Sequence, residues 1–202
     1  LETLEAVEGD HHEDGHEDGG DHDHTGADPH FFTDPVRTAQ AVEGIAAALV
    51  ESVPELDTPA HQERVDDVLA SLADLDEEVR TILDVVGDDD RVLVTNHGSL
   101  AYFADRYDFE VVGTVIPARS TTDAASAADL AALAEVIEQH DVPAIFTDIS
   151  SSTRAAEALA DDVGGIEVVT LHTEALGDEG SGADTYAGMV RSNAEAIADA
   201  LG

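Results

Sequence analysis

The chain has 202 residues, of which 46 are acidic and 8 are basic, and its formal net charge is −38. This length suits one domain, or one lobe together with part of another. The charge excludes nucleic acid as a partner, because like charges repel. The absence of cysteine excludes disulfides, thiolate metal ligands and thiol nucleophiles.

The acidity has two competing explanations, disorder and adaptation to salt. Beyond about residue 35, Val, Ile, Leu and Ala recur with clear periodicity, which argues against disorder. Repulsion among the acids is strong at low ionic strength, but in molar salt the Debye length falls to about 3 Å. The composition therefore predicts a folded protein that is adapted to high salt.

The chain begins with Leu1 rather than methionine and has no apolar leader. We therefore expect a fragment whose N-terminal part, including any signal peptide, is missing. No apolar run approaches the length of a membrane span.

The opening segment interleaves histidine with acids and glycines. Its histidines are His11, His12, His16, His22 and His24. Imidazole and carboxylate bind borderline divalent metals, so we interpret this tract as a flexible metal-binding surface. The alternative is a solvated acidic loop in which histidine is incidental. The tract alone does not distinguish a metal that is sensed, stored, transported or used in catalysis.

Two long helices are predicted after the tract. Asp34 suits the cap of the first helix and Pro35 its first turn, and the helix runs to about Val50 before Pro54 breaks it. The second helix covers about residues 58–86. At roughly 30 residues it spans about 40 Å. We interpret a helix of this length as a connecting strut rather than a core element.

From residue 90 the apolar pattern alternates between strands and helices. The predicted strands are 91–95, 110–115, 143–147 and 166–171, and the predicted helices are 99–107, 125–140, 153–163 and 185–201. Short, almost wholly apolar strands separated by helices predict an α/β lobe, a four-stranded parallel sheet with helices on both faces. In such sheets, ligands bind beyond the carboxyl ends of the strands.

Three predicted strands end at potential metal ligands, which places these ligands on one rim of the sheet. They are His97, Asp148 and the segment from His172 to Glu174, whereas His30 lies in a Pro-flanked loop elsewhere. Each has a simpler interpretation. His97 can cap the following helix, Asp148 can cap or hydrogen-bond the next helix, and His172 can be a solvated loop residue.

The remaining candidates are weaker. His61 and His140 lie at helix ends among acids and are predicted to be surface residues. The run from Ser150 to Thr153 is typical of a helix cap rather than a nucleophile. The sequence contains no glycine-rich phosphate loop, no Gly-x-Ser-x-Gly elbow and no His-Glu-x-x-His motif.

Four segments in chain order support one resemblance. They are Asp28-Pro29-His30-Phe31-Phe32-Thr33-Asp34-Pro35, then Thr95-Asn96-His97-Gly98 followed by 102–107, then Phe146-Thr147-Asp148, and finally 182–193. Over about residues 10–202 the chain resembles the metal-binding lipoproteins of zinc and manganese ABC importers, the cluster A-I solute-binding proteins. The histidine tract resembles the loop of zinc-specific members, and residues 58–86 resemble the helix that links the two lobes.

The resemblance implies a set of metal ligands. His30, His97 and Glu174 match three ligand positions, although the family usually has aspartate at the last of them. A first ligand, a histidine upstream of the acidic loop, is not in this chain. Phe32 replaces the customary tryptophan, and residues 117–121 depart from the usual Glu-Pro-containing loop. Auxiliary metal ligands are expected at His11, His12, His16, His22, His24 and Asp148.

The resemblance also implies a domain organisation. Residues 1–28 form a stub and the acidic histidine-rich loop, 29–57 a remnant of the N-terminal lobe, 58–88 the linking helix and 89–202 the C-terminal α/β lobe.

The function implied is an extracytoplasmic receptor that captures Zn²⁺, with Mn²⁺ as a second candidate, and delivers it to an ABC importer permease. The expected protein is a haloarchaeal monomer without enzymatic activity, anchored to the membrane through a missing lipidated segment. One alternative is a hydrolase with a catalytic zinc, in which Asp148 or Glu174 acts as base on bound water. Others are a manganese-specific receptor and a surface protein that stores metal or aids solubility through the tract alone.

Overall fold

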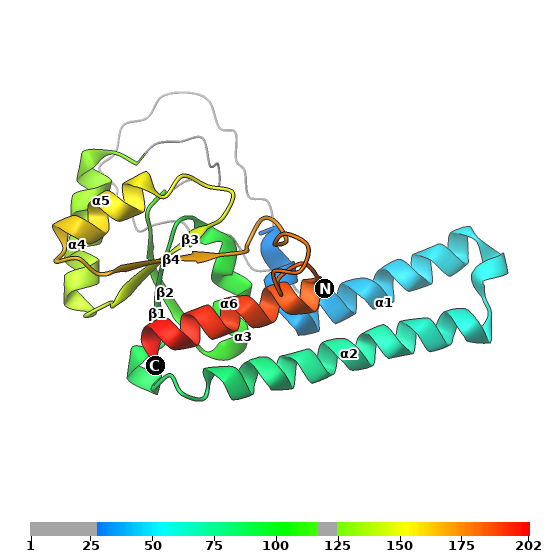
Figure 1. The fold of residues 1–202 in the computed structure, drawn as a ribbon. Coiled ribbons are helices and arrows are strands. Elements are labelled where there is room, and N and C mark those ends of the chain that lie inside the picture. The colour runs from blue at the N-terminus through cyan, green and yellow to red at the C-terminus, as the bar shows by residue number, and fades with distance from the viewer. Residues whose placement is uncertain (1–27, 117–124) are drawn as a thin grey trace, which may run out of the picture.

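A computed structural model describes residues 28–116 and 125–202 of the chain. The five histidines of the opening tract, and the predictions made for residues 117–121, lie outside these described residues. An α/β body forms one end of the molecule, and two antiparallel helices extend from it as an arm (Figure 1).

The body is built on a four-stranded parallel sheet, as predicted. Its strands are β1 (Val92–Thr95), β2 (Glu110–Thr114), β3 (Ala144–Asp148) and β4 (Glu167–Leu171), in the spatial order β2-β1-β3-β4. Because the chain moves outward from β1 in one direction and then returns to place β3 on its other side, β1 and β3 flank the topological switch point. The carboxyl ends of strands at such a point form the usual ligand crevice.

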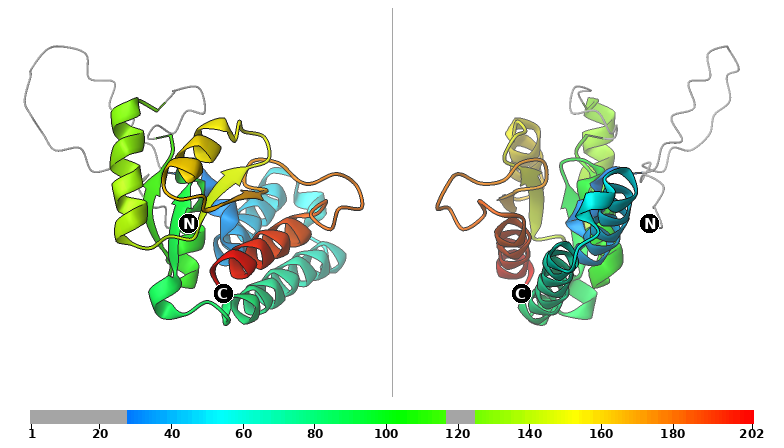
Figure 2. Two further views of the ribbon diagram at one scale, coloured as in Figure 1. Left: turned by 60° about the vertical axis from the view of Figure 1, so that its left-hand side comes forward. Right: turned by 90° about the vertical axis from the view of Figure 1, so that its right-hand side faces the viewer.

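Helices cover both faces of the sheet (Figures 1 and 2). One face packs against α2 (Pro59–Leu83), α3 (Ala101–Tyr107) and α6 (Tyr186–Leu201), and the other against α4 (Ala127–Gln139) and α5 (Arg154–Asp162). Successive side chains of a strand point to opposite faces. Thus Leu93 of β1 belongs to the first core cluster and Val94 to the second.

The arm consists of α1 (Pro35–Ser52) and the first half of α2, joined through a short 3-10 helix at Pro54–Leu56. The Asp34 side chain caps α1 by accepting hydrogen bonds from the backbone N–H groups of Val36 and Arg37. Thr58 caps α2. The predicted start and end signals of both helices are therefore confirmed to within a few residues.

The second half of α2 is a core element. Leu75, Val79 and Leu83 have exposed fractions of 2%, 0% and 1%, whereas Val68 in the arm is 43% exposed. The interpretation of this helix as a strut rather than a core element is therefore wrong for its second half. Helical spacing of apolar residues identifies a face that can be buried, but it does not identify what covers that face.

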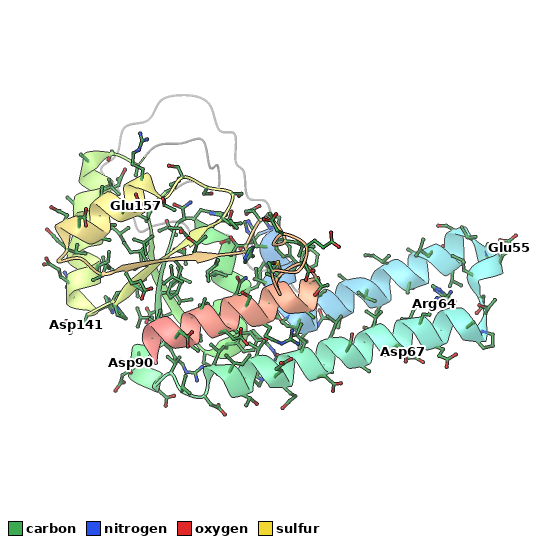
Figure 3. All side chains as sticks on the ribbon, viewed as in Figure 1. Glu55, Arg64, Asp67, Asp90, Asp141 and Glu157 are labelled. Atoms are coloured by element: carbon green, nitrogen blue, oxygen red, sulfur yellow. The ribbon has the colours of Figure 1, made fainter. Side chains whose placement is uncertain are left out.

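Acidic side chains are spread over the outside of the molecule. Figure 3 labels Glu55 near the tip of the arm, Asp90 and Asp141 on the body, and Glu157 on α5, and all four are exposed. Among the described residues, no helix combines the length and the apolar character that crossing a membrane requires.

Candidate metal centre

Three potential metal ligands meet at the carboxyl edge of the sheet. One ligand atom from each of His30, His97 and Glu174 can be chosen so that all three lie within 4.8 Å of one another. Oε1 of Glu174 is 3.0 Å from Nε2 of His30 and 2.9 Å from Nε2 of His97. The two imidazole rings meet edge to face, with their centroids 5.5 Å apart. A single small cation between these atoms could therefore contact all three side chains.

His97 follows the end of β1, at the position that the strand-end rule predicts. Its side chain is 2% exposed, and its Nε2 faces Glu174. The following 3-10 helix, Gly98–Leu100, receives no capping hydrogen bond from this side chain. His97 therefore occupies the N-cap position of this short helix, as the alternative predicts, but its side chain does not cap the helix.

His30 opens a 3-10 helix, His30–Thr33, just before α1. Oδ1 of Asp28 accepts hydrogen bonds from the backbone N–H of His30 at 2.9 Å and from its Nδ1 at 2.6 Å. Because Nδ1 donates to Asp28, Nε2 is the nitrogen whose lone pair can face a metal, an arrangement common among metal-binding histidines. Burial lowers the pKa of His30, but the hydrogen bond and charge of Asp28 and the charge of Glu174 outweigh it and raise that pKa above its usual value.

Two tyrosines, from helices that cover the sheet, hold the segment that carries His30. The hydroxyl of Tyr102 in α3 donates to the backbone oxygen of Asp28 at 3.0 Å, and that of Tyr186 in α6 donates to the backbone oxygen of Phe32 at 2.9 Å. The motif was visible in the sequence but these anchors were not, because the partners are 74 and 154 residues apart. The only local signal was the Asp-x-His spacing of Asp28 and His30.

Asp148, at the end of β3, lies in a buried network of hydrogen bonds. It is 1% exposed. Its Oδ1 accepts hydrogen bonds from the backbone N–H and the hydroxyl of Ser150, and its Oδ2 accepts from both donors of Thr173 and from the backbone N–H of Glu174. Burial raises the pKa of Asp148, but the bonds from Ser150 and Thr173 outweigh it and hold the pKa below its usual value.

The contacts with Ser150 make Asp148 a hydrogen-bonding group of the segment that precedes α5, which is close to one of the predicted alternatives. Thr153 occupies the N-cap position of α5, so Asp148 is not the cap of that helix. Asp148 also lies outside the group of three potential ligands, because both of its oxygens are turned toward hydrogen-bond donors.

The other described histidines lie outside the group. His140 is exposed, as predicted, whereas His61 is half-buried. His172 is half-buried rather than a freely solvated loop residue. Its backbone N–H donates to Oδ1 of Asn193 at 2.8 Å, and its carbonyl accepts from Nδ2 of Asn193 at 2.9 Å.

The donor set determines which ions suit the centre. Two imidazole nitrogens and one carboxylate oxygen are ligands that Zn²⁺ accepts in tetrahedral sites. The fold thus brings three side chains that could hold a metal ion from separate segments of the chain to the carboxyl edge of the sheet.

The family follows from the sequence. The family described as zinc-uptake complex component A, periplasmic, matches residues 1–200, and the chain belongs to this family of zinc and manganese ABC transporter substrate-binding proteins. The zinc-binding protein TroA of Treponema pallidum is 35% identical over 179 residues, which cover 86% of this chain and 57% of that protein. The manganese-binding lipoprotein MntA of Halalkalibacterium halodurans is 25% identical over 176 residues, which cover 87% and 58%.

Solved structures agree with this assignment. The periplasmic zinc-binding protein TroA from Treponema pallidum superposes with a TM-score of 0.78 at 33% identity, over 89% of this chain and 65% of that one. A crystal structure of ZnuA shares the fold, with a TM-score of 0.74 at 24% identity over 87% of this chain and 63% of the other. The chain spans a little over half the length of the curated relatives it matches, at 57% and 58%.

Proposed function

We propose that this chain is the metal-capturing part of an ABC importer receptor and that its cargo is Zn²⁺. The observation that carries the proposal is the convergence of one ligand atom each from His30, His97 and Glu174 within 4.8 Å. Receptors of this kind surround the ion with protein ligands, whereas a catalytic zinc site keeps an open position for water or substrate. In the proposed receptor, a fourth protein ligand would complete the tetrahedron.

The choice of zinc rests on the donor atoms. Imidazole suits zinc, and manganese prefers oxygen ligands and higher coordination numbers. Relatives of both kinds exist, since TroA is named a zinc-binding protein and MntA a manganese-binding lipoprotein. We therefore keep manganese as the second candidate cargo. The histidine-rich tract, through His11, His12, His16, His22 and His24, would collect zinc weakly and raise its local concentration.

The rest of the proposal concerns location and partners. The family is that of a periplasmic zinc-uptake component, and several relatives are named lipoproteins. We place the protein outside the cytoplasm, as a monomer anchored through a lipidated segment, and its partner is the membrane permease. The proposed divisions are 1–28 for the loop, 29–57 for the remnant of a first lobe, 58–88 for the linking helix and 89–202 for the second lobe.

A catalytic metal site is not supported as an alternative. The relatives named above are metal-binding proteins rather than hydrolases. Asp148, one of the two bases considered, accepts five hydrogen bonds and is 1% exposed. A base in this position could not reach a metal-bound water without losing those bonds.

Zinc titration of the full 202-residue chain in molar potassium chloride tests the proposal. Competition with a chelator of known affinity should reveal one site that is tighter than the sites of the tract. A variant lacking residues 9–27 should retain that site, because none of its three proposed ligands is removed. If the deletion abolishes nearly all zinc binding, the protein stores metal through the tract and the receptor proposal fails.

A further inference from the structure

Glu174 lies in a loop whose backbone is held on two sides by buried side chains. The loop follows β4, and residues 172, 173 and 174 each use backbone atoms in bonds to these side chains. The Glu174 side chain is 35% exposed, so it can adopt many rotamers. A backbone that also moved would spread the positions of its carboxylate further.

The first of these side chains is Asp148. Its Oδ2 accepts from the backbone N–H of Thr173 at 2.8 Å, from the Thr173 hydroxyl at 2.7 Å and from the backbone N–H of Glu174 at 3.0 Å. Its Oδ1 is turned toward Ser150 in the loop after β3. Hydrogen bonds to a buried carboxylate are stronger than those between neutral groups. Asp148 therefore joins the loops that follow two neighbouring strands.

The second side chain is Asn193, in the third turn of α6. It is 5% exposed and makes two hydrogen bonds to the backbone of His172, at 2.8 Å and 2.9 Å. These bonds fix the residue at which the chain leaves β4. Together, Asn193 and Asp148 hold the backbone of three consecutive residues, 172–174, the last of which carries the carboxylate.

We propose that Asp148 and Asn193 are positioning residues that hold Glu174 at the correct place for zinc. The inference rests on the proposed function, since it assigns the means by which one proposed ligand is preorganised. Asp148 touches no metal in this scheme and acts through Glu174.

A double-mutant cycle separates positioning from general support of the fold. Asp148→Asn replaces one acceptor oxygen with an N–H donor and so loses bonds to Ser150 or to the Glu174 loop. Loss of a partner that orients a metal ligand typically costs about 10- to 100-fold in metal affinity. We expect this loss for zinc, measured by chelator competition in molar salt. In a Glu174→Ala background, the same change should alter the affinity by less than about 2-fold.

The matched control is Asp141→Asn. Asp141 is an exposed aspartate shortly before β3, at the edge of the sheet opposite the candidate metal centre. Asparagine tolerates the positive φ of 49° at this position. Asp141→Asn removes one negative charge, as Asp148→Asn does, and should leave the zinc affinity unchanged. A cobalt-substituted sample gives an independent readout, because displacement of a carboxylate changes the visible absorption of the bound ion.

Several outcomes would overturn the inference. These are wild-type affinity in Asp148→Asn, an equal loss in Asp141→Asn, or the same loss with and without Glu174. If Asp148→Asn does not fold, Thr173→Val takes its place in the cycle. It removes a single hydroxyl donor, and about a 3-fold loss is expected. A wild-type chain that binds zinc no better than Glu174→Ala would instead refute the proposed function.

Discussion

The Tyr186 hydroxyl lies 2.9 Å from the backbone oxygen of Phe32, and this contact joins α6 to the segment that carries His30. The same hydroxyl lies 3.0 Å from the Thr38 hydroxyl in α1. Burial raises the pKa of Tyr186 to about 12, which keeps the phenol protonated as a donor throughout the physiological range. One side chain thus ties the last helix to the start of the first.

Tyr186→Phe should loosen this connection. The carbonyl of Phe32 then loses the Tyr186 donor, and because this bond is part-buried we expect a cost near the lower end of the roughly 1–3 kcal/mol for an unsatisfied buried group. We expect a lower free energy of unfolding of this size in denaturant titrations, together with weaker zinc binding, because His30 lies two residues from Phe32. Unchanged stability and unchanged affinity would show that this hydrogen bond does not hold the segment.

His97→Ala should remove most zinc binding and leave the fold intact in molar salt. His97 is a proposed ligand at a strand end, and it contributes no helix-capping bond. Calorimetry and circular dichroism measure the two effects separately. His140→Ala is the control, since His140 is an exposed histidine outside the group of three. Equal zinc affinity in the two variants would remove His97 from the site.

Asp76→Asn should destabilise the protein strongly. Asp76, in α2, is 4% exposed, and its Oδ1 accepts from Nε of Arg106 in α3 at 2.8 Å. Burial raises the pKa of Asp76, but the bond and charge of Arg106 outweigh it and lower that pKa. Breaking a buried ion pair costs about 3–5 kcal/mol, and we expect the lower end because Arg106 is 29% exposed and can be rehydrated.

The same helix provides the comparison for Asp76. Nε and Nη2 of Arg191 in α6 each donate to one carboxylate oxygen of Glu78 at 2.7 Å, but both side chains are substantially exposed. Glu78→Gln should therefore change the free energy of unfolding by less than about 1 kcal/mol. Thermal or denaturant melts of the two variants test the contrast, which fails if Glu78→Gln is as damaging as Asp76→Asn.

Lowering the salt concentration should unfold the chain. At about 0.01 M ionic strength the Debye length reaches about 30 Å, so the many exposed acids repel one another across the molecule. Circular dichroism melts across a salt series measure this dependence. Bound zinc should offset part of the loss through mass action. A melting temperature that does not change with salt would contradict the adaptation that the composition predicts.

His97→Glu should shift the preference of the centre toward manganese, because it replaces a nitrogen donor with an oxygen donor. Zinc should remain the tighter ligand, as the Irving–Williams order favours it. Competition titrations with the two ions measure the ratio of affinities in each variant. If manganese displaces zinc from the unmutated chain at equal concentration, zinc is not the preferred cargo.

Much of this architecture could be predicted from local patterns. Capping and breaking residues such as Asp34, Pro54 and Thr58 act on their immediate neighbours, so they marked the helix ends correctly. Apolar runs predicted the strands, and the rule for parallel sheets predicted that His97 and Glu174 would lie on one edge. The order of the strands does not make these two residues neighbours, because β3 lies between β1 and β4. The loop after β4 brings the Glu174 carboxylate to 2.9 Å from His97.

Other features depended on contacts that no local pattern records. The place of His30 at the sheet came from a family resemblance, and its physical cause is the pair of hydrogen bonds from Tyr102 and Tyr186. Asp148 at a strand end has the same local signal as a metal ligand, and only the positions of Ser150 and Thr173 around it distinguish a hydrogen-bonding role.

By itself, the sequence determined the α/β class, the approximate element boundaries and the residue types available for a metal. Short-range interactions decide these properties, since periodicity, capping and turn chemistry act over a few residues. The tertiary structure alone decided that His30 meets His97 and Glu174, that α2 enters the core, and that Asp148 faces hydrogen-bond donors. Such outcomes depend on which distant groups cover a buried side chain, and a buried polar atom acquires its role from the partner that satisfies it.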